Sequence, residues 1–216
     1  MQKLAEIWRY PVKSLGGEQL PRAFVGPDGI AGDRVVHVED RRGRVVTARS
    51  HPRLLLHRAT LGPDGEPLVD GRVWTSPEVA KDIVEAAGSG TRLVRDESLQ
   101  RFDVLPLLVA TDGAISSLGY DRRRFRPNLL LGGVTGLAER EWEGSHLCVG
   151  SAIIRIVTLR RRCIMTTFDP DTAAQDNEVL LRIHRELGGL LALDCEVLQP
   201  GDVNVGDPVE VRLPDD

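Results

Sequence analysis

One cysteine of this sequence stands where neighbouring charge could change its chemistry. Cys163 follows three consecutive arginines, Arg160 to Arg162, and is followed closely by two threonines. A free thiol has a pKa of about 8.5 and stays mostly protonated at neutral pH unless positive charge lies nearby. Arginine keeps its proton, so this run would supply permanent positive charge. Two interpretations remain open: a thiolate that acts as nucleophile or metal ligand, or a buried thiol beside a solvated arginine face.

The remaining cysteines are of a different kind. Cys148 and Cys195 lie in short strand-like patterns, where cysteine commonly serves as a small buried apolar residue. An odd number of cysteines without close pairing argues against a disulfide framework and fits a reducing compartment. The sequence shows no apolar stretch of signal-peptide length at its start and no run of about 18 apolar residues. We therefore expect a cytoplasmic protein with no membrane association.

Composition and missing motifs exclude several classes of function. The 216 residues carry a formal net charge of −4, so no overall basic footprint indicates a nucleic-acid partner. The sequence contains no phosphate-binding glycine loop that ends in Lys-Ser or Lys-Thr, no Gly-x-Gly-x-x-Gly, no His-Glu-x-x-His and no Cys-x-x-Cys. Common nucleotide, dinucleotide and zinc sites are thus unsupported.

The elements that must position Cys163 are mostly strands. Many short alternating segments, separated by turn residues, predict a mainly β (α+β) fold that is barrel-like and built of short, mostly antiparallel strands. Two of these predicted strands cover residues 19–25 and 54–61. About three helices are expected: one capped by Ser76 that ends near residue 87, one from Thr111 or the next residue to 118, and one that starts at Asp176 and ends before Gly188.

Five segments would make chemical sense around one anionic ligand. Arginine's fixed fork of donors suits phosphate oxygens, and serine or threonine hydroxyls add hydrogen bonds. A thiolate beside such a cluster suggests a phosphorylated cofactor with a soft metal centre. Taken singly, each segment is better explained as a cap or as solvated charge. The segments are Lys13-Ser14, Gly32-Asp33-Arg34, Thr111-Asp112, Arg124 to Asn128, and the Cys163 run.

Motifs along nearly the whole chain carry a specific resemblance. They are Tyr10-Pro-Val-Lys-Ser14, Gly32-Asp-Arg34, Val46-Thr-Ala-Arg49, Phe125-Arg-Pro-Asn128, Arg162-Cys-Ile-Met-Thr-Thr-Phe-Asp-Pro-Asp-Thr172 and Val205-Gly-Asp-Pro-Val209. In this order they resemble the MOSC family, which is named for the C-terminal domain of molybdenum cofactor sulfurases. The sequence is most similar to the branch of the mitochondrial amidoxime-reducing components. The resemblance implies the MOSC fold, with an N-terminal β module over residues 1–90 and a MOSC domain over residues 91–216.

The resemblance also implies roles for particular residues. Cys163 would be the molybdenum ligand, and Cys163 and Asp169 would be the catalytic residues. Contacts to the pterin or phosphate of the molybdenum cofactor would come from a larger set of basic and polar side chains. These are Lys13, Ser14, Arg34, Thr111, Arg126, Asn128, Thr166 and Thr167.

Two functions are compatible with this resemblance. The first is a molybdenum-cofactor oxidoreductase that reduces small N-hydroxylated or N-oxide compounds. The sequence has no cysteine-rich ferredoxin segment, so electrons would come from a separate donor, such as a ferredoxin, a flavoprotein or a cytochrome b5-like protein. The alternative is a non-catalytic carrier of molybdenum cofactor or of sulfur, the latter as a Cys163 persulfide in a transfer that needs no pyridoxal phosphate. Both functions require the same cofactor contacts.

Overall fold

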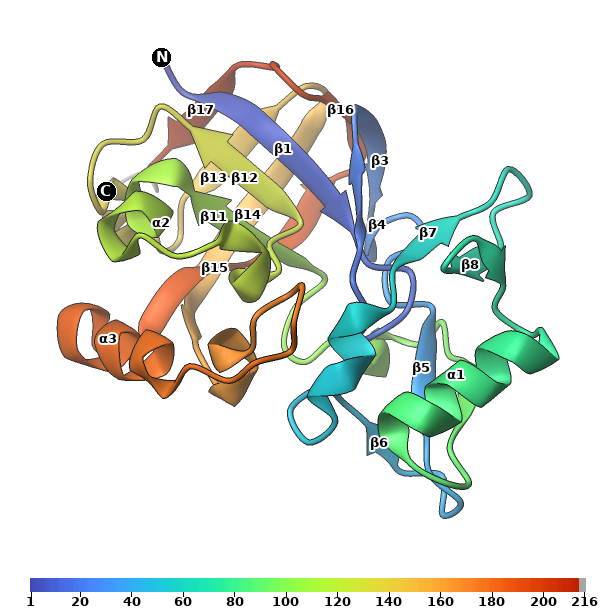
Figure 1. The fold of residues 1–216 in the computed structure, drawn as a ribbon. Helices are drawn as coiled ribbons and strands as arrows, with labels where there is room; N and C mark the ends of the chain where they lie inside the picture. Colours follow the sequence, from blue (N-terminus) through green and yellow to red (C-terminus); the bar gives the residue numbers. More distant parts are fainter. Residues whose placement is uncertain (214–216) are drawn as a thin grey trace.

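The computed structural model describes residues 1–213 and confirms a mainly β fold (Figure 1). Its largest element is an eight-stranded sheet in which β11 and β12 run parallel and all other neighbours run antiparallel. In spatial order its strands are β17 (Val209–Arg212), β13 (His146–Val149), β14 (Ala152–Arg161), β15 (Leu190–Gln199), β11 (Leu107–Thr111), β12 (Leu129–Gly132), β1 (Lys3–Arg9) and β2 (Glu18–Leu20).

The term barrel-like applies to this sheet loosely. An isolated antiparallel bridge between Lys3 and Pro208 connects β1 to the chain just before β17. Within residues 1–213 no continuous ladder closes the sheet. The curved sheet nevertheless encloses an apolar core that includes Leu4, Ile7 and Leu193, each with no exposed surface. Burial of these side chains holds β1 against β12, so an N-terminal strand extends a sheet whose other strands, apart from β2, come from residues 107–212.

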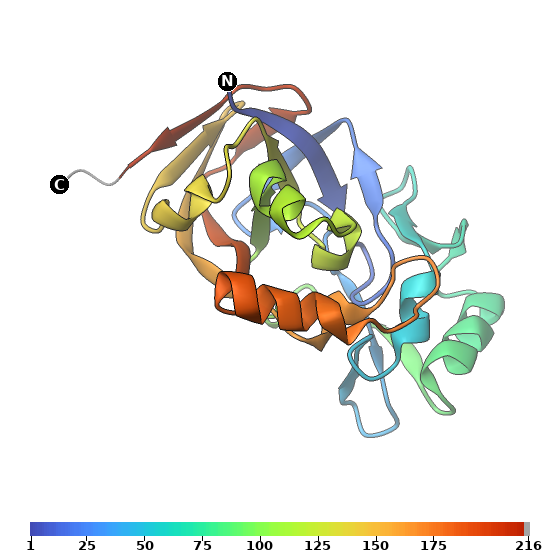
Figure 2. The same ribbon diagram turned by 60° about the vertical axis from the view of Figure 1, so that its left-hand side comes forward.

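The three α-helices within the described residues lie where their capping residues predict them. Helix α1 (Pro77–Ala87) is capped by Ser76, helix α2 (Asp112–Leu118) by Thr111 and helix α3 (Asn177–Leu187) by Asp176. Each cap side chain accepts a backbone N–H of the first turn, at 3.3, 3.1 and 3.0 Å respectively. Helices α2 and α3 cover one face of the large sheet through a shared apolar cluster (Figures 1 and 2).

Smaller sheets build the rest of the molecule. Residues 12–87 form a second apolar core, joined by Phe168. Its strands make two three-stranded sheets, and a third such sheet packs against the large one. The strands are β10 (Arg92–Arg95), β5 (Val36–Glu39) and β6 (Val45–Val46); β7 (Ala59–Leu61), β8 (Pro67–Val69) and β9 (Arg72–Val73); and β16 (Gly201–Asn204), β3 (Arg22–Gly26) and β4 (Gly29–Ile30).

Two predicted strands are wrong in detail. Residues 19–25 form two strands, because Pro21 lacks a ladder donor and separates β2 from β3, which belong to different sheets. Residues 54–61 begin inside a 3-10 helix that follows a proline and become β7 only at Ala59. The 3-10 helices are η1 (Pro52–Leu56), η2 (Leu99–Arg101), η3 (Arg122–Phe125), η4 (Ala138–Glu141) and η5 (Ile164–Thr167).

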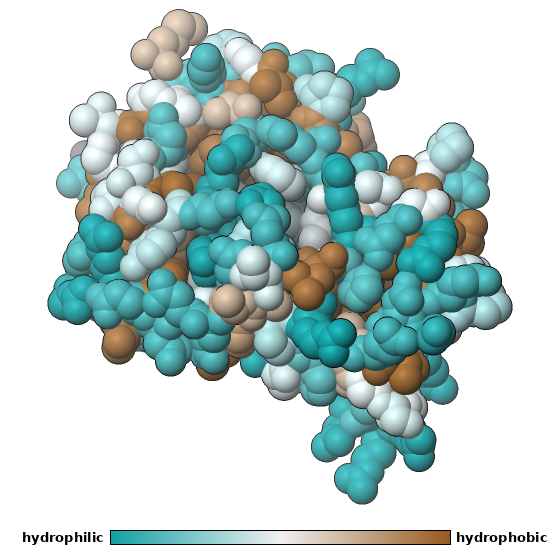
Figure 3. Space-filling view, in the orientation of Figure 1, coloured by the Kyte–Doolittle hydropathy of each residue, from teal (hydrophilic) through white to brown (hydrophobic). Residues whose placement is uncertain are grey.

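The two ends of the chain are interlocked. Strands β1 and β2 lie in the sheet of the C-terminal half, while β16 pairs with β3 of the N-terminal half. A division near residue 90 stays a prediction. On the face shown in Figure 3, hydrophilic residues predominate and apolar residues form small separate groups. None of the helices in residues 1–213 is long and apolar enough to cross a membrane.

Candidate functional site

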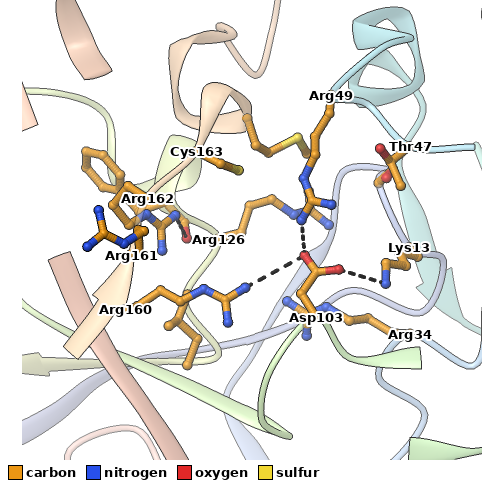
Figure 4. Close-up of a pocket in the computed structure, with 14 residues that line it drawn as sticks. Lys13, Arg34, Thr47, Arg49, Asp103, Arg126, Arg160, Arg161, Arg162 and Cys163 are labelled. Atoms are coloured by element: carbon orange, nitrogen blue, oxygen red, sulfur yellow. Dashed lines mark hydrogen bonds and ion pairs between the residues drawn. The ribbon is translucent and has the colours of Figure 1, made fainter. Parts of the chain in front are cut away.

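Five of the predicted site residues line one cavity (Figure 4). These are Lys13, Ser14, Arg34, Arg126 and Cys163, and they come from both halves of the chain. Basic side chains dominate the lining, and Asp103 is the one carboxylate among the described residues that line it. The other lining residues are Thr47, Arg49, Leu108, Phe125, Arg160, Arg161, Arg162 and Met165.

The backbone at three of these positions is strained. Ser14, Arg34 and Arg126 have φ values of 73°, 56° and 53°, in the left-handed region that favours glycine. Such a conformation costs on the order of 1–3 kcal/mol per residue and persists when the surrounding structure enforces it. The strain turns a hydroxyl and two guanidinium groups toward one cavity.

Tyr10 forms the support under the two strained arginines. The guanidinium carbons of Arg126 and Arg34 lie 4.1 and 5.2 Å from the centre of its ring, within cation–π range. Its hydroxyl donates to the carbonyl of Pro127 at 3.1 Å, and its backbone N–H donates to Asp33 at 2.7 Å. Burial raises the pKa of Tyr10 to about 12, so the ring remains neutral.

Arg126 and Arg162 have donors without acceptors. Arg126 donates to the carbonyl of Leu15 at 2.7 Å, and Arg162 donates to the carbonyl of Phe125 at 2.8 Å. Among residues 1–213, no acceptor reaches the buried Nη2 of Arg126 or the buried Nε of Arg162. Burial lowers the pKa of each guanidinium to about 10. Unsatisfied buried donors of a cation are costly, and an anionic ligand would satisfy them.

Asp103 is the acceptor shared by three other cations. Its carboxylate lies 2.9 Å from Lys13 Nζ and 3.7 Å from Arg160, and it also pairs with Arg49 (Figure 4). Burial works against its charge, but these cations outweigh burial and the net effect is a lowered pKa for Asp103. Arg160 is held from its other side by Asp194 at 3.0 Å.

Cys163 is exposed at the edge of this cavity, directly after β14 and before η5. Burial tends to lower the pKa of Arg49, but Asp103 and the sulfur of Cys163 raise it more, and the net shift is upward. Cys195 differs sharply, because it is fully buried and burial raises the pKa of its thiol. Cys148 is half-buried in β13. The thiol that faces the cations is therefore also the accessible one.

The remaining predicted residues serve the architecture around the cavity. Asn128 is buried, and its side chain bonds Asp33, the carbonyl of Trp8 and the N–H of Leu108. Thr111 caps α2 and donates to Glu139 at 3.1 Å. Among the residues that the structure describes, Asn128 and Thr111 do not line the cavity, and neither do Thr166, Thr167 and Asp169.

The segment after Cys163 is organised by local bonds. Thr166 donates to the carbonyl of Cys163 at 3.0 Å, and Thr167 donates to that of Ile164 at 2.7 Å, so both hydroxyls stabilise η5. Asp169 accepts the N–H of Thr172 at 3.0 Å and pairs with Arg124 at 2.9 Å. These contacts hold the loop that presents Cys163.

Sequence reasoning did not select several lining residues as ligand contacts. Arg49 stands in one of the motifs that carry the resemblance, and Arg160 to Arg162 belong to the Cys163 run, yet the sequence alone gives none of the four a specific ligand contact. Asp103 was missed altogether, since nothing in Phe102-Asp103-Val104 distinguishes it from an ordinary loop carboxylate. Its position follows from tertiary contacts with Lys13 and Arg49.

Comparison with known proteins gives consistent results. The chain is 27% identical to "Mitochondrial amidoxime reducing component 2" of Macaca fascicularis, over 95% of this chain and 82% of that protein. It is 26% identical to "Mitochondrial amidoxime-reducing component 1" of Mus musculus, over 95% and 81% of the two chains. Among solved structures, the YUAD protein from Bacillus subtilis covers 100% of this chain with 98% of its own, at a TM-score of 0.53 and 16% identity. That likeness establishes the fold.

Family assignments divide the chain into the two parts that form the cavity. Residues 1–95 match the MOSC N-terminal beta barrel domain, and residues 111–210 match the MOSC domain. Lys13, Arg34 and Arg49 fall in the first part, and Arg126 and Cys163 fall in the second. The chain therefore belongs to the MOSC family and joins the family's N-terminal domain to the MOSC domain itself.

Proposed function

We propose that the protein binds molybdenum cofactor in the cationic cavity and reduces small N-hydroxylated or N-oxide compounds. The observation that carries this proposal is the pair of buried, acceptor-free donors on Arg126 and Arg162 within residues 1–213, beside an exposed cysteine. Two such donors need an anion, and a thiolate at the same cavity suits a soft metal. The named activity of the two mitochondrial relatives supports the same reaction class.

The residues present fit a phosphorylated, metal-bearing group. Lys13, Arg49 and Arg160 converge on the carboxylate of Asp103, and their donors can hold phosphate oxygens at the same position. Arg126 and Arg162 offer their free donors in the same cavity, and the thiolate of Cys163 would hold the metal. When bound, the molybdenum cofactor would supply the two-electron chemistry.

The protein would contribute position and charge. The Tyr10 ring fixes the directions of Arg34 and Arg126, so these cations need little reorganisation when an anion binds. The bonds of Thr166 and Asp169 fix the loop on which Cys163 stands. Because Cys163 is exposed, a small substrate can approach the metal position directly from solvent.

Electrons would come from a separate protein. The relatives are named as components of an amidoxime-reducing system, which supports a donor outside the chain. The cations around Cys163 favour a donor whose docking surface is acidic, since charge complementarity accelerates association. The candidate donors are a ferredoxin, a flavoprotein and a cytochrome b5-like protein.

Metal analysis tests the proposal. The full chain, produced in a host that makes molybdenum cofactor, should contain close to one molybdenum per molecule and release a pterin on denaturation. A second molybdoenzyme loaded in the same host serves as the control. Background molybdenum in this protein alone would refute the proposal.

Turnover separates reduction from carriage of the cofactor. The exposed Cys163 thiol would also suit a protein that hands on the cofactor, or sulfur as a persulfide. With reduced viologen as electron donor, a reductase converts a simple amidoxime to the amidine, whereas a carrier shows no conversion. Loaded protein without turnover would leave the binding part of the proposal standing and remove the catalytic part.

A further inference from the structure

Asp103 occupies the place where the cavity concentrates its charge. Three cations from separate elements meet at its carboxylate: Lys13 after β1, Arg49 after β6 and Arg160 near the end of β14. Figure 4 shows the three side chains directed at this one group. A carboxylate has two oxygens for these donors, whereas a tetrahedral oxyanion has four and can carry a second charge.

The other acidic partners of the lining cations are fixed. Asp33, which pairs with Arg34, is fully buried and also accepts the N–H of Tyr10 at 2.7 Å. Asp194, which holds Arg160, is also buried. Asp103 differs from both, because 34% of its side chain is exposed.

Asp103 also has space into which it can turn. It lines the cationic cavity and a second, smaller cavity, which Leu105, Asn128 and Asp194 also line and which shares Arg34 and Arg160 with the first. The next residue, Val104, is 56% exposed. Rotation of the side chain into the second cavity can therefore take the carboxylate away from Lys13 and Arg49, which do not line that cavity, while buried Phe102 anchors the segment.

We propose that Asp103 is a specificity-determining residue. Its carboxylate is an internal monoanion that a dianionic tetrahedral group can displace from the three cations, whereas a free monoanion cannot. This inference rests on the proposed function in that the dianion would be the phosphate of the cofactor. A free monoanion that replaces Asp103 gains no charge and must compete with a group held permanently at high effective concentration. A dianion doubles the attraction to Lys13, Arg49 and Arg160 and fills more of their donors.

Sulfate and perchlorate test this inference, because the two ions share shape and size and differ in charge. The full chain would be produced in a host without molybdopterin synthesis, and each ion titrated by calorimetry at constant ionic strength. Wild type should bind sulfate and show little perchlorate binding. In Asp103→Asn, the affinity for perchlorate should rise on the order of tenfold or more, and more than that for sulfate.

Glu97→Gln provides the matched control. It removes a carboxylate from the same segment, but that carboxylate is 63% exposed, pairs with Arg95 at 2.6 Å and lies outside the cationic cavity. This variant should preserve the preference for sulfate. Thermal unfolding of both variants verifies that they are folded.

Two outcomes would overturn the proposed role of Asp103. If both ions bind more weakly to Asp103→Asn, the carboxylate organises the cations and the inference is overturned; unchanged affinities overturn it as well. The metal content of protein from a cofactor-producing host is a separate measurement. Molybdenum binding with unaltered ion selectivity would refute the role of Asp103 alone, and the converse result would refute the proposed function alone.

Discussion

Arg126→Met tests whether a buried charge is kept for ligand binding at the expense of stability. The pKa of Arg126 falls from 12.5 to about 10 because the side chain is buried. At 1.36 kcal/mol per pKa unit, this corresponds to about 3 kcal/mol against the charged form. The folded protein bears this cost in full at neutral pH, and it is relieved only as pH rises through about 10 toward the unfolded value.

Methionine removes the charge and retains most of the side-chain length. The lost interactions are the hydrogen bond to Leu15 and the cation–π contact with Tyr10, together worth about 1–3 kcal/mol. We therefore expect the cofactor-free Arg126→Met protein to equal wild type or exceed it by up to about 2 kcal/mol in urea unfolding. Cofactor retention should fall by about 10- to 100-fold, because a charge-assisted bond to phosphate contributes about 1.5–3 kcal/mol.

Arg124→Met is the control from the same motif. Arg124 pairs with Asp169 at 2.9 Å, donates to the carbonyl of Thr167 at 3.0 Å and is absent from the cavity lining. Its loss should destabilise the protein, as expected when a satisfied, half-buried ion pair is broken, and should lower cofactor retention less than Arg126→Met does, since Arg124 contributes no donor to the cavity. A strongly destabilised Arg126→Met protein with normal cofactor retention would refute the reasoning.

Three further predictions concern single residues. Cys163→Ser should abolish reductase activity, while Cys195→Ser should lose about 1–3 kcal/mol of stability by burying a hydroxyl yet keep its activity per folded molecule. Gly17→Ala should lower both stability and cofactor retention, since a Cβ at residue 17 would collide with the Tyr10 ring that supports the arginines; unaltered retention at limiting cofactor would contradict this. Because Asp103 has a lowered pKa, it contributes stability above pH 4 that disappears as pH falls through its folded value. Urea unfolding at pH 5 and pH 3 should show a smaller difference for Asp103→Asn than for wild type.

Features with local causes were predictable from the sequence. The caps of all three α-helices in the described residues act within four residues of the helix start, so Ser76, Thr111 and Asp176 mark these starts correctly. The prediction of one strand over residues 54–61 is wrong, because an apolar run of this length fits a strand or a buried turn equally well. Pro21 gave a local signal for the break between β2 and β3, which the prediction of one strand passed over.

The site was predictable only in part, because side-chain contacts depend on tertiary structure. Lys13 and Arg126 do line the cavity, as the motifs suggested. Asn128 belongs to the same motif as Arg126, yet its amide bonds backbone groups and Asp33 and so supports the cavity from behind. Motif membership cannot separate these two positions, since both are needed to build the site. Asp103 carries no local signal, and its importance arises where three distant cations meet.

The interlocked sheets explain why the cavity needs both halves of the chain. Strand β1 is held between β12 and β2, and it delivers Tyr10 and Lys13 immediately after its end. Strand β12 begins directly after Asn128 and is fixed by that same pairing, so Arg126 is placed against Tyr10 by the register of β1 and β12. A shift of this register would turn the buried face of β1 outward and separate the arginine from its support. Apolar burial in the large sheet is thus what holds two like-charged guanidinium groups over one ring, where a dianion can compensate them.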